Sequence, residues 1–242
     1  MVDLHTHILP DVDDGAENVV EAIEMLQAAA NSGTKRVVFT PHYLVRDLRC
    51  LRSYTKEELF ERFNSIKALA SERVPGIELY MGAEVAGISD IQEVIDADNL
   101  ITINNTKYVL LEFGFHDFRD RAMNVAQTLL DNGYIPIIAH PERYDFVQRN
   151  PRNLVPFIES GMLLQVNTTS LEGMSGEAAQ DVALSLIENR LAAVVSSDAH
   201  SMYRRIPDLS EAFAFISSNI SKEYAEKLFY ENPFAVLNGH RL

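Results

Sequence analysis

The sequence lacks the features typical of membrane, secreted and nucleic-acid-binding proteins. No window approaches the run of about 18 apolar residues that a membrane-spanning helix needs. The first residues carry no basic segment, and Asp3, His5 and His7 interrupt any apolar stretch, so we expect no signal peptide and a cytoplasmic location. Only 21 Lys and Arg residues face 35 Asp and Glu residues, a net charge of −14. This balance argues against binding to nucleic acid or to anionic lipid.

Cysteine chemistry is nearly absent as well. The single cysteine, Cys50, leaves no internal disulfide possible. Cysteine-dependent tyrosine phosphatases need a Cys-x5-Arg loop after a strand, whereas Lys56 occupies the place of that arginine and no strand precedes Cys50. We therefore expect Cys50 to take no part in catalysis. The chain also has no GxGxxG after its first strand and no GxxxxGK[ST], the common nucleotide-binding loops.

What the sequence has is a regular alternation of predicted strands and helices. The strands are short, continuous apolar runs, the pattern of parallel strands buried on both faces. Seven such repeats with no linker predict one α/β domain over residues 1–242, a closed or nearly closed parallel barrel, with a Rossmann-type open sheet as the alternative. The predicted strands are Val2–Leu4, Arg36–Thr40, Ile77–Met81, Lys107–Leu111, Ile135–Ala139, Leu163–Val166 and Leu191–Ser196.

Helical periodicity and capping signals fill the intervals between these strands. Residues Thr55–Glu58 carry a capping-box signature, which opens a helix that continues through Leu69. Gly33, Gly133 and Gly161 stand where helices are expected to end. The other predicted helices are Asn18–Ala30, Asp90–Ala97, Arg119–Leu130, Arg152–Ser160, Gly176–Asn189, Leu209–Ile216 and Lys222–Phe229.

A nitrogen or oxygen metal ligand accompanies the end of most predicted strands. His5 and His7, two positions apart, point the same way on a strand and can grip one ion. Asp198 and His200 repeat this spacing after the last strand, which neighbours the first in a closed barrel. Because functional residues gather at the carboxyl ends of barrel strands, the pattern predicts a metal cluster there. Its residues are His5, His7, His42, Glu84, Glu112, His140, Asp198 and His200.

An acidic segment, Asp11–Gly15, follows the first strand. Carboxylates this close repel one another unless a cation or a helix N-terminus lies nearby. Because a helix is predicted within a few residues, capping and metal binding are equally open for Asp11 and Asp13. For Asp14 we favour metal binding.

The chain strongly resembles the polymerase and histidinol phosphatase (PHP) family of metal-dependent phosphoesterases. The resemblance covers residues 2–210 and rests on the ligand pattern above. Within the family the chain is most similar to the tyrosine-protein phosphatases of Gram-positive capsule and exopolysaccharide operons. Three long motifs carry that closer likeness: Asp3–Gly15, Ala139–Tyr144 and Ser196–His200.

The resemblance implies a distorted (βα)7 TIM-like barrel of the PHP type, with three divalent metal ions. The family is generally described with manganese, although such ligands also serve iron, zinc and magnesium. Arg143 and Arg205 match arginines that hold the phosphate; Arg204 is the alternative to Arg205, because the local motif departs from the usual Gly-Arg-Pro-Pro. By resemblance, one ion takes His5, His7, Glu84 and Asp198, a second takes Glu84, Glu112 and His140, and a third takes Asp14, His42 and His200.

The function implied is a protein-tyrosine phosphatase that hydrolyses phosphotyrosine with a metal-activated hydroxide. Its expected partner is the phosphorylated tail of a membrane-associated bacterial tyrosine kinase that regulates capsular or exopolysaccharide synthesis, with no insertion of the enzyme into the membrane. A small-molecule phosphatase, such as a histidinol-phosphate phosphatase, is the main alternative. A nuclease-like proofreading module and a non-catalytic metal-binding scaffold are further ones, and the acidic charge and the full ligand set argue against them.

Overall fold

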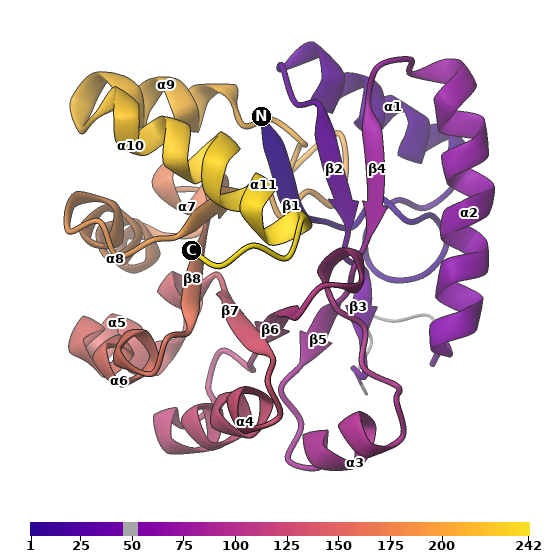
Figure 1. Cartoon of the computed structure of the whole chain (residues 1–242). Coiled ribbons are helices and arrows are strands. Elements are labelled where there is room, and N and C mark those ends of the chain that lie inside the picture. The colour runs from indigo at the N-terminus through magenta and orange to yellow at the C-terminus, as the bar shows by residue number, and fades with distance from the viewer. Residues whose placement is uncertain (46–52) are drawn as a thin grey trace.

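Parallel strands occupy the centre of the molecule and helices surround them, as Figure 1 shows. The computed structural model describes residues 1–45 and 53–242. Cys50 lies outside the described residues, so its expected inactivity stays a prediction. Among the described residues, no helix combines the length and the apolar character that crossing a membrane requires.

All strand pairs are parallel, as the apolar runs predict. They form two sheets, ordered β1-β2-β4 and β3-β5-β6-β7-β8-β9. The strands are β1 Val2–Thr6, β2 Arg36–Phe39, β3 His42–Tyr43, β4 Glu78–Met81, β5 Glu84–Ala86, β6 Tyr108–Glu112, β7 Ile135–Ala139, β8 Leu163–Asn167 and β9 Val194–Ser196.

Two of the expected barrel strands are interrupted. Pro41, which has no N–H to donate, stands between β2 and β3, and Gly82 stands between β4 and β5. The same neighbours stay paired across both breaks, because the Gly82 amide donates to the Phe39 carbonyl at 2.9 Å and the Glu84 amide donates to the Pro41 carbonyl at 3.1 Å. With each interrupted pair counted once, the described residues contain the seven strands that the sequence predicts.

The first and last strands meet just beyond the end of β9. Thr6 and Ala199 form an isolated parallel bridge. The His7 amide donates to the Ala199 carbonyl at 2.8 Å, and the Asp198 amide donates to the His5 carbonyl at 3.0 Å. This seam brings the two ligand pairs of the sequence side by side and makes the arrangement a distorted barrel rather than an open Rossmann-type sheet.

The helices begin and end close to their predicted limits. Asn18 caps α1 by accepting from the Val20 and Glu21 amides, and Thr55 and Glu58 form the expected capping box of α2. The helices are α1 Val19–Asn31, α2 Lys56–Arg73, α3 Ile91–Asp96, α4 Arg119–Asp131, α5 Asp145–Arg149, α6 Val155–Glu159, α7 Thr168–Leu171, α8 Glu177–Glu188, α9 Ser210–Asn219, α10 Lys222–Glu226 and α11 Asn232–Leu237.

Two predicted helices are divided in the structure. Residues Arg152–Ser160 form a 3₁₀ turn over Pro151–Leu154 and then α6. The last predicted helix ends early as α10, and a wider π-helical turn over Lys227–Glu231 leads into α11. The short helices α5 and α7 were not predicted, because neither is long enough to show a helical period.

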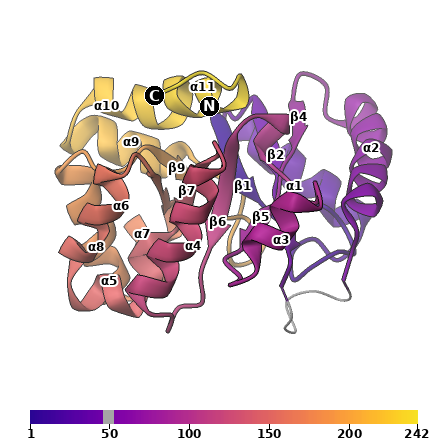
Figure 2. The ribbon, with the colours of Figure 1, turned by 60° about the horizontal axis from the view of Figure 1, so that its bottom comes forward.

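Helices α10 and α11 lie over the amino end of the barrel, where β1 begins (Figure 2). Val236 and Leu237 of α11 pack with Val2, Leu4 and Tyr108 in one buried apolar cluster. The Tyr108 hydroxyl also donates to the His240 carbonyl at 2.6 Å. This end of the barrel is therefore sealed by apolar side chains.

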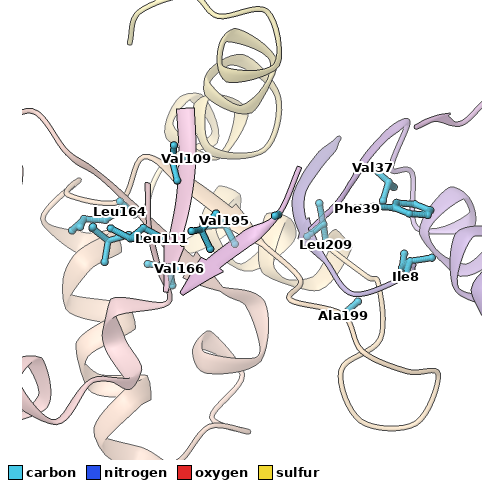
Figure 3. Close-up of a cluster of buried hydrophobic side chains, with 14 of the residues drawn as sticks. Ile8, Val37, Phe39, Val109, Leu111, Leu164, Val166, Val195, Ala199 and Leu209 are labelled. Carbon is cyan, nitrogen blue, oxygen red and sulfur yellow. The ribbon is translucent and has the colours of Figure 1, made fainter. Parts of the chain in front are cut away.

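Side chains on the outer faces of the strands form the main core. Val37 and Phe39 of β2, Val109 and Leu111 of β6, and Val195 of β9 belong to it, as Figure 3 shows. Helices cover this face and the barrel interior lies behind the other. Both faces of each strand are therefore shielded from water, which is why the strands read as continuous apolar runs.

Candidate metal centre

The predicted ligands converge at the carboxyl end of the barrel. The strands or the turns directly after them supply all but Asp14, which lies in the loop between β1 and α1. All except Asp14 are buried. Most of these side chains line a cavity of about 350 Å³. That cavity is lined by Asp14, His42, Glu84, Glu112, Phe113, Gly114, Phe115, His140, Arg143, Asp198, His200 and Arg205.

The first predicted site lies deepest. The Nε2 atoms of His5 and His7 stand 3.2 Å apart, as expected for side chains two positions apart on β1. Glu84 Oε1 lies 3.2 Å from His5 Nε2, and Asp198 Oδ1 lies 3.3 Å from the same nitrogen. Two ring nitrogens and two carboxylates thus point at one small volume.

Glu84 connects this group to the second one. Its Oε1 lies 3.0 Å from His140 Nε2, and its Oε2 lies 2.8 Å from His42 Nδ1. Glu112 is more distant, with its oxygens 3.8 Å from both His140 Nε2 and His42 Nδ1. Glu84 is therefore placed to contribute to two ions, as the sequence interpretation requires.

Asp14, His42 and His200 form the third group, nearest the solvent. Asp14 Oδ1 lies 3.4 Å from Nε2 of both histidines. The ring of His7 packs against His42 and His200, with centroids 4.5 and 3.9 Å away. Among the described residues, His7 can share an ion with this group as well as with His5 and Glu84, and His42 with Glu84 and Glu112.

The two uncertain carboxylates of the acidic segment have different roles. Asp13 accepts from His7 Nδ1 at 2.7 Å, from the His42 amide at 2.9 Å and from the Gly15 amide at 3.0 Å. It therefore orients two predicted ligands. Asp11 is exposed and lies 3.4 Å from Arg62. Gly15 is required by close packing, because a Cβ there would overlap the backbone of His7.

Backbone geometry marks two of the ligands as unusual. His140 has φ of 32° and Asp198 has φ of 53°, in the left-handed region that side chains other than glycine rarely adopt. Such conformations persist where the surrounding structure fixes them, and they concentrate at functional sites. Sequence patterns carry no sign of this strain.

The charges of the cluster are strongly interdependent. Burial lowers the pKa of His42, but the nearby Glu84 carboxylate outweighs it and the pKa rises to about 9. Burial and the neighbouring His7 lower the pKa of His200 to about 4. Burial raises the pKa of Asp198, yet His5, His200 and Arg205 hold it well below its usual range. The Asp198 carboxylate therefore remains ionised and available to a cation.

The seam between the first and last strands contains a carboxyl group that the sequence did not single out. Asp3 accepts from the Ser197 hydroxyl at 2.6 Å and from the Ser197 amide at 3.1 Å. Burial raises the pKa of Asp3 to about 6. Asp3 fixes the turn that presents Asp198. An acid inside an otherwise apolar strand was the only sequence sign of this role.

The two predicted arginines reach the cavity wall. Arg205 Nη1 donates to Asp198 Oδ2 at 2.9 Å, and Arg143 Nη1 lies 3.5 Å from the same oxygen. The Arg143 guanidinium also stacks 4.4 Å from the ring centroid of Phe115. Arg204 lines a neighbouring hollow rather than this cavity. His116 is a solvated loop residue, paired with Asp145 at 2.9 Å.

Comparison with known proteins connects this geometry to a family. The family described as "Capsular polysaccharide synthesis, CpsB/CapC" matches residues 1–238. The tyrosine-protein phosphatase YwqE of Bacillus subtilis is 33% identical, over 95% of this chain and 87% of that protein. The tyrosine-protein phosphatase CpsB of Streptococcus pneumoniae is 27% identical, over 98% of each chain.

A solved structure matches the whole fold. It comes from crystal structures of YwqE from B. subtilis and CpsB from S. pneumoniae, described there as unique metal-dependent tyrosine phosphatases. The TM-score is 0.92 at 29% identity, covering 100% of this chain and 96% of the other. A TatD-family hydrolase from Entamoeba histolytica shares the fold alone, with a TM-score of 0.57 at 13% identity.

Proposed function

The chain belongs to the CpsB/CapC family of capsular polysaccharide synthesis, and on that premise we propose that it is a metal-dependent protein-tyrosine phosphatase. One observation carries the proposal: nine histidine and carboxylate donors and two arginines converge at one end of the barrel, in a protein whose relatives are named tyrosine-protein phosphatases. The whole chain, residues 1–242, would act as a single phosphoesterase domain.

We propose three divalent ions, with manganese as the native metal. The donor chemistry fits them, because imidazole nitrogens and carboxylate oxygens together suit manganese, iron and zinc. The close approach of His5 Nε2 to His7 Nε2 fits too, since two ring nitrogens that face each other can share a cation. The proposed ligands are His5, His7, Asp14, His42, Glu84, Glu112, His140, Asp198 and His200.

Charge balance supports this number of ions. Four carboxylates contribute about −4 and three divalent ions about +6, which leaves a local surplus of about +2 in a protein that is acidic overall. A phosphate dianion would be attracted by that surplus and repelled without it. Divalent ions also lower the pKa of water and polarise phosphoryl oxygens when they are bound.

The residues of the chain itself position the substrate. Arg143 and Arg205 stand at the cavity wall, where planar guanidinium groups can each hold phosphate oxygens. Asp198 and Phe115 restrain these two side chains before substrate arrives. Arg143 and Arg205 would neutralise the phosphoryl oxygens as charge develops on them.

The proposed substrate is a phosphotyrosine protein, namely the tail of a membrane-associated bacterial tyrosine kinase. The relatives' names give the phosphotyrosine part of this proposal. The identity of the substrate as such a kinase, and a cytoplasmic location for the enzyme, are parts of the proposal that go beyond those names. A phosphorylated segment of a flexible tail could reach a cavity that opens at the end of the barrel.

Phosphate release from a phosphotyrosine peptide tests this function. Protein freed of metal would be given manganese, zinc or magnesium in turn, with a phosphoserine peptide and histidinol phosphate alongside. Manganese-restored activity on phosphotyrosine is the expected result. Activity on histidinol phosphate alone would identify a small-molecule phosphatase, and silence on all three with metal bound would contradict the proposal.

A further inference from the structure

Strand β8 is the unusual strand of the barrel, because it supplies none of the proposed ligands and yet carries two buried amides. Gln165 and Asn167 are both fully buried. Two positions apart, they face the barrel interior, whereas Leu164 and Val166, which alternate with them along the strand, point into the core under the helices (Figure 3). A buried amide costs free energy unless hydrogen bonds satisfy it, so these two need partners.

Their hydrogen bonds run in one direction between two proposed ligands. His5 Nδ1 donates to Gln165 Oε1 at 3.0 Å, and Gln165 Nε2 donates to Asn167 Oδ1 at 2.7 Å. Asn167 Nδ2 then donates to Asp198 Oδ2 at 2.8 Å. We call these two side chains the amide relay.

We propose that the amide relay positions His5 and Asp198 for the ion that they share. The inference rests on the metal ligands assigned under the proposed function. Gln165 and Asn167 are not among the proposed ligands. They would act through His5 and Asp198, which lie one on each side of the seam between β1 and the end of β9.

The direction of the hydrogen bonds gives each end of the relay a definite task. Because an amide oxygen can only accept, His5 must carry a proton on Nδ1 in this bond. The tautomer protonated there leaves Nε2 as the atom that can bind metal. At the other end, Asp198 Oδ2 is occupied by Asn167 and Arg205, which leaves Oδ1 facing His5 Nε2 at 3.3 Å. The relay thus selects one atom of each ligand.

A second contact ties the relay to the neighbouring strand. The backbone N–H of Asn167 donates to Glu142 Oε1 at 3.0 Å, and Glu142 is itself fully buried two residues after His140. The backbone N–H of His140 donates to Gln165 Oε1 at 3.4 Å. The relay is therefore fixed to the turn that presents a third ligand and is not a free pair of side chains. Partners of this kind typically change metal affinity about 10–100-fold when they are removed.

Two variants test the relay through metal binding. Gln165→Leu removes the hydrogen bonds of the Gln165 side chain to His5, Asn167 and the His140 backbone at similar volume. Asn167→Asp keeps the shape and the bond from Gln165, but sets an oxygen against Asp198. After dialysis against a chelator that leaves three Mn²⁺ ions on the wild type, we expect each variant to retain one ion fewer. The Mn²⁺ concentration for half-maximal activity should rise about 10–100-fold, with kcat restored at saturating Mn²⁺.

Gln180→Leu is the matched control. Gln180 is half-buried and also donates one side-chain hydrogen bond, to the Leu171 carbonyl at 2.9 Å, but it does not line the metal cavity. The control should keep the wild-type Mn²⁺ count. Melting of the metal-free proteins checks folding, and the isosteric Asn167→Asp carries the test if Gln165→Leu does not fold.

The metal count by mass spectrometry decides the relay without any assay of phosphatase activity. Wild-type Mn²⁺ counts in both relay variants, or an equal loss in Gln180→Leu, would overturn it. A wild type that binds no Mn²⁺ would overturn the relay together with the proposed metal site. A wild type that binds Mn²⁺ but leaves phosphotyrosine intact would overturn only the proposed function.

Discussion

The two ends of the barrel are built from opposite kinds of side chain. At the amino end, Val236 and Leu237 of α11 close the interior with apolar contacts. At the carboxyl end, buried histidines and carboxylates crowd together within about hydrogen-bond distance. The first arrangement stabilises the fold, whereas the second gains its stability from the ions it would bind. Stability and function are thus concentrated at different ends of the same strands.

Removing the carboxylate shared by two proposed ions should produce the largest effect. We expect Glu84→Gln to lower kcat/KM on a phosphotyrosine peptide about 1000-fold, because an amide binds divalent ions far less well. Steady-state kinetics with excess Mn²⁺ would measure it. Glu78→Gln is the control, since Glu78 lies at the other end of the interrupted strand formed by β4 and β5 and contacts Arg36 at 2.9 Å. A kcat/KM of Glu84→Gln within tenfold of the wild-type value would contradict the assignment of function to the carboxyl end.

A substitution at the amino end of the barrel should change stability and leave activity unchanged. We expect Leu237→Ala to lower the free energy of unfolding by about 3 kcal/mol, because it empties part of the apolar seal. Urea unfolding would measure this, and kcat of the folded enzyme should be unchanged. Leu242→Ala, at an exposed leucine nearby in the chain, should change stability by less than about 0.5 kcal/mol. An activity loss in Leu237→Ala that persists in fully folded protein would break the separation of the two ends.

Metal removal should destabilise the carboxyl end. Ions that bind only the folded state add about 2.7 kcal/mol per independent site at one hundred times the dissociation constant. We therefore expect the melting temperature to fall on treatment with a chelator and to return with Mn²⁺. The Leu237→Ala shift should be similar with and without Mn²⁺, since distant sites act additively. A melting temperature that does not change with Mn²⁺ would contradict the claim that bound ions stabilise the carboxyl end of the barrel.

A pH effect at the amino end should be the smallest. Tyr224 of α10 donates to the Ala192 carbonyl at 2.8 Å, and burial raises the pKa of Tyr224 to about 12. Its raised pKa favours folding below pH about 10, and this contribution is lost as the pH rises toward 12. Tyr224→Phe should therefore cost about 1 kcal/mol at pH 8 and less at pH 11. Urea unfolding of both proteins at the two pH values measures the difference in their free energies of unfolding. A difference that grows with pH would contradict the raised pKa of Tyr224 in the folded state.

The sequence was sufficient for the strands and for the convergence of His5 with His7, because both depend on local periodicity. His5 and His7 converge since side chains two apart share a face, and the apolar runs mark strands covered on both faces. The separate strands β3 and β5 could not be predicted. His42–Tyr43 is too short to show any period and exists through its pairing with β5.

Roles that depend on distant partners were beyond the sequence. Asp13 was equally open to capping and metal binding, and its position under His7 follows from the fold of the loop around Gly15. Gln165 is one polar residue in an apolar strand, and only its neighbours across the barrel give it a function. The seal formed by α11 was missed because a helix that short carries no clear signal of which surface it covers.

The most direct test of the central claim is to locate the ions. Crystals grown with Mn²⁺ would be measured at the manganese absorption edge, where anomalous scattering marks each ion. We predict three peaks in the cavity at the carboxyl end, within bonding distance of the nine proposed ligands, with Glu84 contacting two of them. An absence of peaks there, or peaks held by other residues, would contradict the account.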